Sequence, residues 1–135
     1  MRVLALDHGA ARCGVAVSDP TGTLATPVGV VERPDTKRGL ERIEALVHEH
    51  DAVLVVVGLP LSLSGGDSAQ TTETRVFAAK LERQLSVPVE LYDERFTTKI
   101  AQRTGGAADE DSRAAAHLLD DWLAARARGA EVAGG

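Results

Sequence analysis

The fold of this chain is decided by residues 2–18, which read RVLALDHGAARCGVAVS. An apolar run leads directly to Asp7, which is the pattern of a buried strand that ends on an acid. A turn bounded by Gly9 and Gly14 leads into a second apolar run, and a strong turn signal after it leads into a third. The predicted strands are residues 2–7, 15–18 and 24–31. Short strands joined by tight turns predict an antiparallel meander.

Beyond this meander the sequence alternates helical and strand patterns. Apolar residues at helical spacing predict a helix that starts at residues 34–36, with Asp35 as its N-cap. Residues 53–57 lack alternation, as expected for a strand buried on both faces. The remaining predicted elements are a helix at 70–85, a strand at 88–92, a short helix from Thr97 to Gly105, and a helix from about 109 to 128. This order predicts an α/β fold: a mixed sheet of the meander plus parallel strands, flanked by helices.

Composition limits the class of protein. A chain of 135 residues, 44% hydrophobic, is large enough for one domain, which we expect over residues 1–128 with a flexible tail at 129–135. The single cysteine, Cys13, offers no disulfide framework, and no apolar run reaches the roughly 18 residues of a membrane span. We therefore expect a cytoplasmic domain with no membrane association.

The net charge of −5 excludes an overall basic nucleic-acid-binding protein. It does not exclude a local basic strip around an acidic centre, because bound cations would cancel the charge of clustered carboxylates. Basic residues do lie near the candidate acids in sequence: Arg12, Arg95, Lys99, Arg103 and Arg113.

Three carboxylates are candidates for a divalent-metal site: Asp7, Glu94 and Asp111. Glu94 lies two residues beyond Tyr92 at a strand end, where open α/β sheets place their sites. At about 100° per residue, Asp111 lies on the helix face that also carries apolar core positions. Each acid also has a structural interpretation: a capped loop for Asp7, a solvated strand end for Glu94, and dipole complementation for the acidic run at 109–111.

The sequence gives less support for a zinc site, a cysteine nucleophile or a P-loop. His8 could face a substrate, but the four histidines lack the spacing of zinc ligands. Cys13 has no histidine partner in a supporting context, and the P-loop signature is missing from the sequence.

Five segments, taken together and in this order, resemble the motifs of the YqgF/RuvX family. They are residues 7–19 (DHGAARCGVAVSD), 57–61 (VGLPL), 75–78 (RVFA), 93–98 (DERFTT) and 111–115 (DSRAA). The resemblance implies an RNase H-like fold and a nuclease, usually described as processing pre-16S rRNA in ribosome maturation. The same family has also been described as Holliday junction resolvases.

Carried onto this chain, the resemblance assigns catalysis and metal binding to Asp7, Glu94 and Asp111. We hypothesise Mg²⁺ (or Mn²⁺) as the cofactor, with the basic residues Arg12, Arg95, Lys99 and Arg113 contacting nucleic acid. The expected partner is pre-16S rRNA, with branched DNA as the alternative, and the protein is expected to be a monomer or homodimer. Residues 104–110 are short and acidic where family members usually carry a longer basic segment, so a catalytically inactive nucleic-acid-binding module stays open as an alternative.

Overall fold

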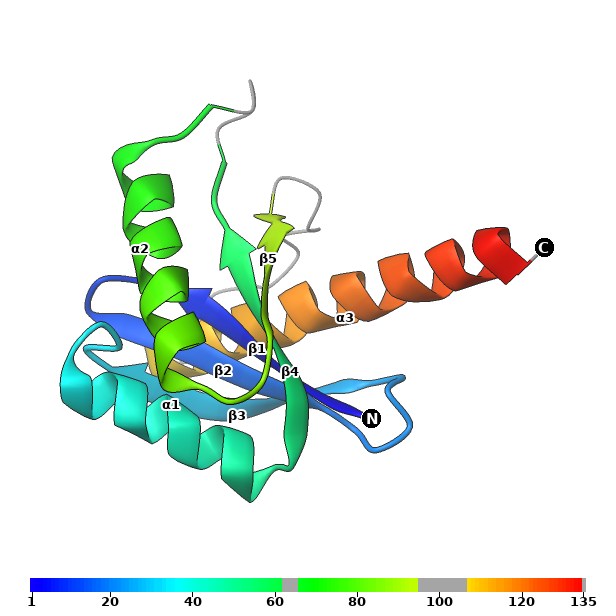
Figure 1. Ribbon diagram of the computed structural model, residues 1–135, viewed down its shortest axis with the longest axis horizontal. Helices are drawn as coiled ribbons and strands as arrows, with labels where there is room; N and C mark the ends of the chain where they lie inside the picture. The colour runs from blue at the N-terminus through cyan, green and yellow to red at the C-terminus, as the bar shows by residue number, and fades with distance from the viewer. Residues whose placement is uncertain (62–65, 95–106, 135) are drawn as a thin grey trace.

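The computed structural model describes residues 1–61, 66–94 and 107–134 (Figure 1). The strands are β1 (Arg2–His8), β2 (Arg12–Ser18), β3 (Ala25–Glu32), β4 (Ala52–Leu59) and β5 (Val89–Asp93). The helices are α1 (Lys37–Glu49), α2 (Ala69–Gln84) and α3 (Ala107–Gly134). The short helix expected from Thr97 to Gly105 lies outside the described residues.

All five strands form one sheet, in the order β3-β2-β1-β4-β5. The first three strands are antiparallel neighbours, which confirms the predicted meander. Strands β4 and β5 are added in parallel on the other side of β1, each reached through a helix. The mixed α/β sheet predicted from the sequence is therefore confirmed, and β1 lies at its centre.

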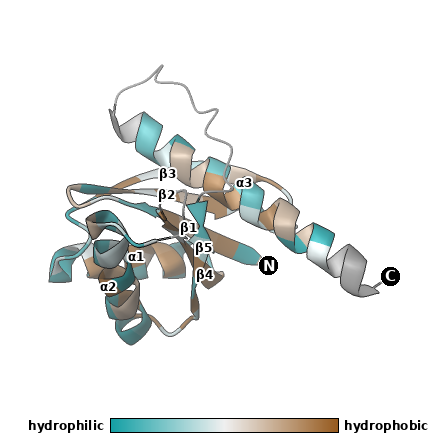
Figure 2. Cartoon of the chain, turned by 90° about the horizontal axis from the view of Figure 1, so that it is seen from above, coloured by the Kyte–Doolittle hydropathy of each residue, from teal (hydrophilic) through white to brown (hydrophobic). Residues whose placement is uncertain are grey.

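The helices cover the sheet from both sides, with α1 and α2 on one face and α3 on the other (Figure 2). Residues of β1 alternate between the two layers. Leu4 and Leu6 pack with α1 and α2 around Phe77, whereas Val3 and Ala5 pack with α3 around Trp122. A central strand that buries both faces explains the uninterrupted apolar run before Asp7.

The beginning of α1 corrects one expectation. Its N-cap is Thr36, whose hydroxyl accepts a hydrogen bond from the Gly39 amide at 3.1 Å, and not Asp35. The Asp35 carboxylate instead bonds Nε2 of His8 at 2.7 Å, a partner 27 residues away that local sequence rules cannot anticipate.

Helix α3 also differs from its expected length, because it continues to Gly134 rather than ending near residue 128. Its C-terminal part extends past the sheet, as the red end of the ribbon shows in Figure 1. Alanine recurs through this part, and alanine has the highest helix propensity. The division into a domain and a tail at residue 128 stays a prediction. No helix within the described part of the chain is both long and apolar enough to cross a membrane.

Candidate active site

The candidate site is built on a row of three residues across neighbouring strands, with Asp7 in the middle. Asp7 of β1 pairs with Gly14 of β2. On its other side, the β1–β4 register places Gly58 beside Asp7, one step beyond the pair Leu6–Val57. Alternation puts the half-buried Asp7 on the α3 face, with Val3 and Ala5. The Asp7 carboxylate therefore stands between two positions that carry no side chain.

Gly14 lets the first turns of α3 rest directly on the sheet. A Cβ atom at Gly14 would lie 1.9 Å from the backbone oxygen of Asp111, a distance that no packing adjustment of side chains could relieve. The absence of a side chain at Gly14 thus brings Asp111 onto the strand that flanks Asp7.

Gly58 plays the corresponding part for Glu94. A Cβ atom at Gly58 would lie 2.5 Å from Oε1 and 2.9 Å from Cγ of Glu94, so the Glu94 side chain lies across this glycine. Tyr92, two residues earlier, packs against the α3 layer, as the predicted alternation requires. Asp7, Glu94 and Asp111 are therefore gathered along one row on one face of the sheet, although they lie far apart in sequence.

The three acids are gathered without forming a closed ligand set. Among the described residues, no three His, Cys, Asp or Glu side chains are close enough together to hold one metal ion. Asp111 instead forms an ion pair with Arg12, whose Nε lies 3.0 Å from its Oδ2. Carboxylates that share a small region repel one another, and a guanidinium beside one of them lowers that repulsion.

Asp111 lies on the buried face of helix α3, as expected from the helical spacing. Ala115, Leu118 and Trp122 are buried against the sheet, and Asp111 is half-buried at the start of the same face. The Trp122 indole Nε1 donates a hydrogen bond of 2.6 Å to Glu90 of β5. This bond helps to fix α3 on the edge of the sheet that also carries Glu94.

His8 lies on the opposite face of the sheet from Asp7, where its side chain packs and forms hydrogen bonds within the fold. Its ring stacks on Phe77 with centroids 4.2 Å apart, Nε2 lies 2.7 Å from Asp35, and Nδ1 lies 3.2 Å from Thr74. These contacts tie the end of β1 to α2 and to the segment before α1. The alternation of His8 with Leu4 and Leu6 was the sequence signal for this face.

Cys13 is fully buried and is not placed to act as a nucleophile. Burial raises the pKa of its thiol well above the usual value, and the nearby charges of Asp7, Asp35 and Asp111 raise it further. The thiol is therefore neutral at physiological pH.

The basic residues predicted to contact nucleic acid are only partly covered by the structure. Arg12 is exposed beside Asp111, and Arg113 is half-buried two residues further along α3. Arg95 and Lys99 lie outside the described residues, as do residues 104–106 of the acidic segment.

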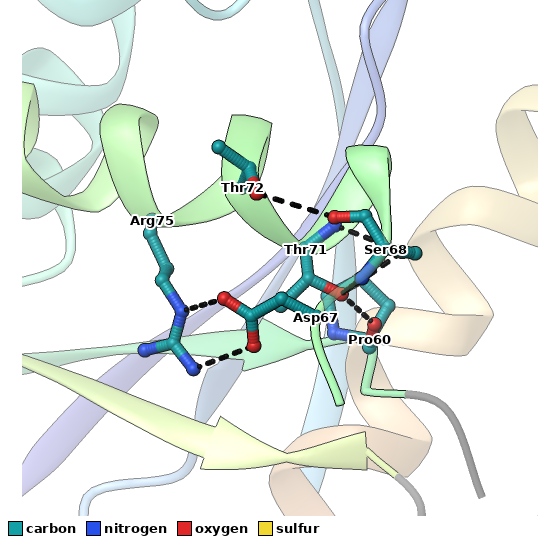
Figure 3. Close-up of polar contacts among 6 residues, drawn as sticks. All are labelled: Pro60, Asp67, Ser68, Thr71, Thr72 and Arg75. Carbon is teal, nitrogen blue, oxygen red and sulfur yellow. Dashed lines mark hydrogen bonds and ion pairs between the residues drawn. The ribbon is translucent and has the colours of Figure 1, made fainter. Parts of the chain in front are cut away.

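A polar cluster that the sequence did not reveal holds the chain after β4, next to the site (Figure 3). Arg75 forms a two-point ion pair with Asp67, with Nε to Oδ2 at 2.8 Å and Nη2 to Oδ1 at 3.1 Å. The Arg75 hydrogen bond lowers the pKa of Asp67. Ser68 and Thr71 form a capping box at the start of α2, and the Thr71 hydroxyl also donates to the carbonyl of Pro60. The segment that leaves β4 is thereby attached to α2.

Comparisons with known proteins agree on a family. A model of the RuvX family, described as Holliday junction resolvase, matches residues 1–125. A protein of Mycobacteroides abscessus named "Putative pre-16S rRNA nuclease" is 45% identical and aligns over 94% of this chain and 83% of its own length. A Streptomyces avermitilis protein of the same name is 42% identical over 91% of this chain and 80% of its own length.

Solved structures resemble this chain in fold. RuvC of Thermus thermophilus in complex with a Holliday junction substrate superposes with a TM-score of 0.56 at 18% identity, covering 93% of this chain and 95% of that one. Fowlpox virus resolvase, also solved with Holliday junction DNA, gives a TM-score of 0.52 at 12% identity, covering 91% and 99%. At such identities the likeness shows a shared fold, and it confirms the RNase H-like class expected from the resemblance.

Proposed function

The chain belongs to the RuvX family and is therefore a nuclease, and we propose that it cleaves phosphodiester bonds with divalent cations held by Asp7, Glu94 and Asp111. The observation that supports this proposal is the row Gly14–Asp7–Gly58. The backbone of Asp111 lies over Gly14, and the side chain of Glu94 lies over Gly58. At Gly14 the missing side chain admits the α3 backbone, and at Gly58 it admits the Glu94 side chain, so both acids approach Asp7.

The donor set fits a hard cation. Three carboxylates offer only oxygen ligands, and Mg²⁺ or Mn²⁺ is commonly held by few protein carboxylates together with water and phosphate oxygens. When bound, such an ion supplies an activated water and stabilises negative charge on the phosphate and the leaving oxygen. Three unneutralised carboxylates in direct contact would repel one another, and a bound cation would remove that repulsion and allow them to approach.

Arg12 has two parts in this proposal. Without substrate it neutralises Asp111 through the 3.0 Å ion pair. With substrate, its guanidinium would bind a phosphate oxygen, and the Asp111 carboxylate would then be available to hold the cation. Arg95, Lys99 and Arg113 are proposed to contact the sugar-phosphate backbone, which positions the strand without reading its bases.

The substrate we propose is pre-16S rRNA, because relatives that align over most of this chain are named "Putative pre-16S rRNA nuclease". We propose that the cut lies in its 5′ leader. Such a protein would act in the cytoplasm, where a buried thiol such as Cys13 stays reduced. A single active site suffices for cutting one RNA strand, so a monomer is compatible with this function.

The family description supports a second candidate, resolution of Holliday junctions. Symmetric cutting of a four-way junction needs two active sites and hence a homodimer. Sedimentation of the protein with junction DNA distinguishes the candidates, since a strictly monomeric complex contradicts the resolvase.

The test of the proposed site is cleavage by the variant Asp7→Asn, with end-labelled 5′ leader RNA and a four-way DNA junction in Mg²⁺ or Mn²⁺. We expect cleavage to fall by about 10³-fold or more, because a lost cation ligand removes several kcal/mol of transition-state stabilisation. Asn has the shape of Asp, so thermal unfolding should change little.

The matched control is Asp51→Asn, the same chemical change at an exposed acid at the far end of β4. Asp51 has φ of 52°, a conformation that asparagine tolerates. Equal cleavage by wild type and Asp7→Asn would reject the site. Binding without cleavage by the wild type would support the inactive module instead.

A further inference from the structure

A strip of exposed arginines leads away from the proposed site around the sheet edge and onto helix α1. Its members are Arg12, Arg33, Arg38 and Arg42. Arg12 opens β2, where it is opposite Glu32, the last residue of the edge strand β3. The next residue, Arg33, donates its backbone amide to the Ala11 carbonyl at 2.9 Å. The strip is thus continuous with the arginine that contacts Asp111.

Two surface hollows follow the same path. One, of about 420 Å³, is lined by Ala10, Ala11, Arg33, Asp35 and Thr36, so it begins at the turn that follows Asp7 and His8. The other, of about 550 Å³, lies between the end of β3 and the start of α1, and its charged lining residues are Glu32, Arg33, Arg38 and Arg42. Arg33 lines both hollows. A chain that leaves the site along the β1–β2 turn would therefore meet the guanidinium groups in succession.

The charges of this strip are mostly unsatisfied by the protein itself. Within the described part of the chain, neither Arg33 nor Arg38 forms an ion pair with a carboxylate. Arg42 lies 3.4 Å from Glu49, but both side chains are 55% exposed, and such pairs contribute little. Asp35, which lines the first hollow, is already bonded to His8. In the second hollow one acid, Glu32, lies beside three arginines, so this region carries a local excess of positive charge in a chain of net charge −5.

Hydrogen bonds hold the backbone beneath the strip, and two features of its sequence are unfavourable for local stability. Arg33 has φ of 45°, a left-handed conformation that glycine or asparagine adopts at lower cost. Its carbonyl accepts a 2.7 Å hydrogen bond from the Thr36 hydroxyl, which fixes the entry to α1. The first turn of α1 carries Lys37 and Arg38 and no acid, although cations are disfavoured at this end of a helix. An anion bound here would offset both costs.

We propose that Arg33, Arg38 and Arg42 form a second phosphate-binding surface, which holds the part of the nucleic-acid strand that flanks the cut. This proposal rests on the proposed function, in which Asp7, Glu94 and Asp111 cleave that strand. Arg12 connects the active site to this surface, so the protein would bind substrate on both sides of Arg12 and not only at the reacting phosphate. It also gives an acidic protein a basic region for nucleic acid within the described residues.

The experiment measures equilibrium binding of fluorescent 5′ leader RNA in EDTA, where no cleavage occurs, between 50 and 200 mM salt. The test variant is Arg33→Gln/Arg38→Gln. We expect about tenfold weaker binding and a slope of log K against log salt that is smaller by about 1.5, because two phosphate contacts are lost. The variant Arg33→Lys/Arg38→Lys keeps the charge and should bind within about threefold of wild type.

The matched control is Lys80→Gln/Arg83→Gln on α2, which changes the net charge by the same two units at the end of α2 remote from the site. Equal weakening by the control and the test variant, or none by either, overturns the proposal. Cleavage assayed separately in Mg²⁺ tests the proposed function. Wild type that binds through the strip but does not cleave contradicts the proposed function, whereas wild type that cleaves while the test variant binds normally contradicts the strip.

Discussion

On the α3 face of β1, Asp7 is flanked by Gly14 and Gly58, while on the other face the next residue, His8, is stacked on Phe77 and bonded to Asp35 and Thr74. On the His8 face, hydrogen bonds and ring stacking tie the strand end to its neighbours, whereas on the Asp7 face two glycines let the Asp111 backbone and the Glu94 side chain approach the sheet. Satisfied polar networks hold a structure in one arrangement, whereas carboxylates brought together on one face are suited to binding a cation. Of these two adjacent residues of β1, Asp7 thus belongs to the proposed active site, and His8 belongs to the packing that stabilises the fold.

The largest expected effect is at Gly14, where the Asp7 face of the sheet meets α3. Gly14→Ala would place a Cβ 1.9 Å from the Asp111 backbone oxygen, so the helix must shift off the sheet. We expect the free energy of unfolding to fall by about 3 kcal/mol, as for overpacking that only backbone movement can relieve. Urea unfolding followed by circular dichroism measures this loss. A change below about 1 kcal/mol would contradict the close packing of α3 on β2.

Gly58 gives the matched case in which the obstacle is a flexible side chain. In Gly58→Ala the new Cβ displaces the Glu94 carboxylate, whose Oε1 would be 2.5 Å away, while the backbone can stay in place. We expect cleavage to fall by about 10²-fold, the usual cost of a catalytic group misplaced by about 1 Å, with little change in unfolding free energy. Single-turnover cleavage beside urea unfolding separates the two effects. Full activity in a stable variant would show that Glu94 acts elsewhere.

On the His8 face of the sheet, His8→Phe keeps a ring against Phe77. It removes both hydrogen bonds of the imidazole, to Asp35 and to the buried Thr74. We expect a loss of about 2 kcal/mol in unfolding free energy, because a buried hydroxyl and a carboxylate lose their partner. Cleavage measured well below the unfolding temperature should stay close to wild type, because this side chain faces away from Asp7. A large loss of activity in the folded variant would move His8 into the proposed site.

The sequence predicted those features that depend on local pattern. The apolar run before Asp7, the meander and the buried face of Ala115, Leu118 and Trp122 all follow from periodicity. Glycine is also the residue type that permits close backbone contact, which the structure shows at Gly14.

Features that depend on register or on distant partners could not be read in this way. Gly58 becomes a neighbour of Asp7 only once β4 is paired with β1, and Glu94 reaches it only through β5. Asp35 has the residue type of an N-cap, but its tertiary bond to His8 takes precedence. The Arg12–Asp111 ion pair likewise joins residues that are 99 positions apart, which no local rule relates.

The central proposal for this protein is that Asp7, Glu94 and Asp111 form one cation-binding centre along the row of Gly14, Asp7 and Gly58. The most direct measurement is a crystal structure grown with Mn²⁺, with anomalous differences collected at the manganese absorption edge. We predict an anomalous peak on the α3 face of the sheet, within about 2.0–2.3 Å of an Asp7 oxygen and ligated by Glu94 or Asp111, together with rotation of Arg12 away from Asp111. Well-ordered density for all three carboxylates at saturating Mn²⁺ with no peak between them would contradict the assignment.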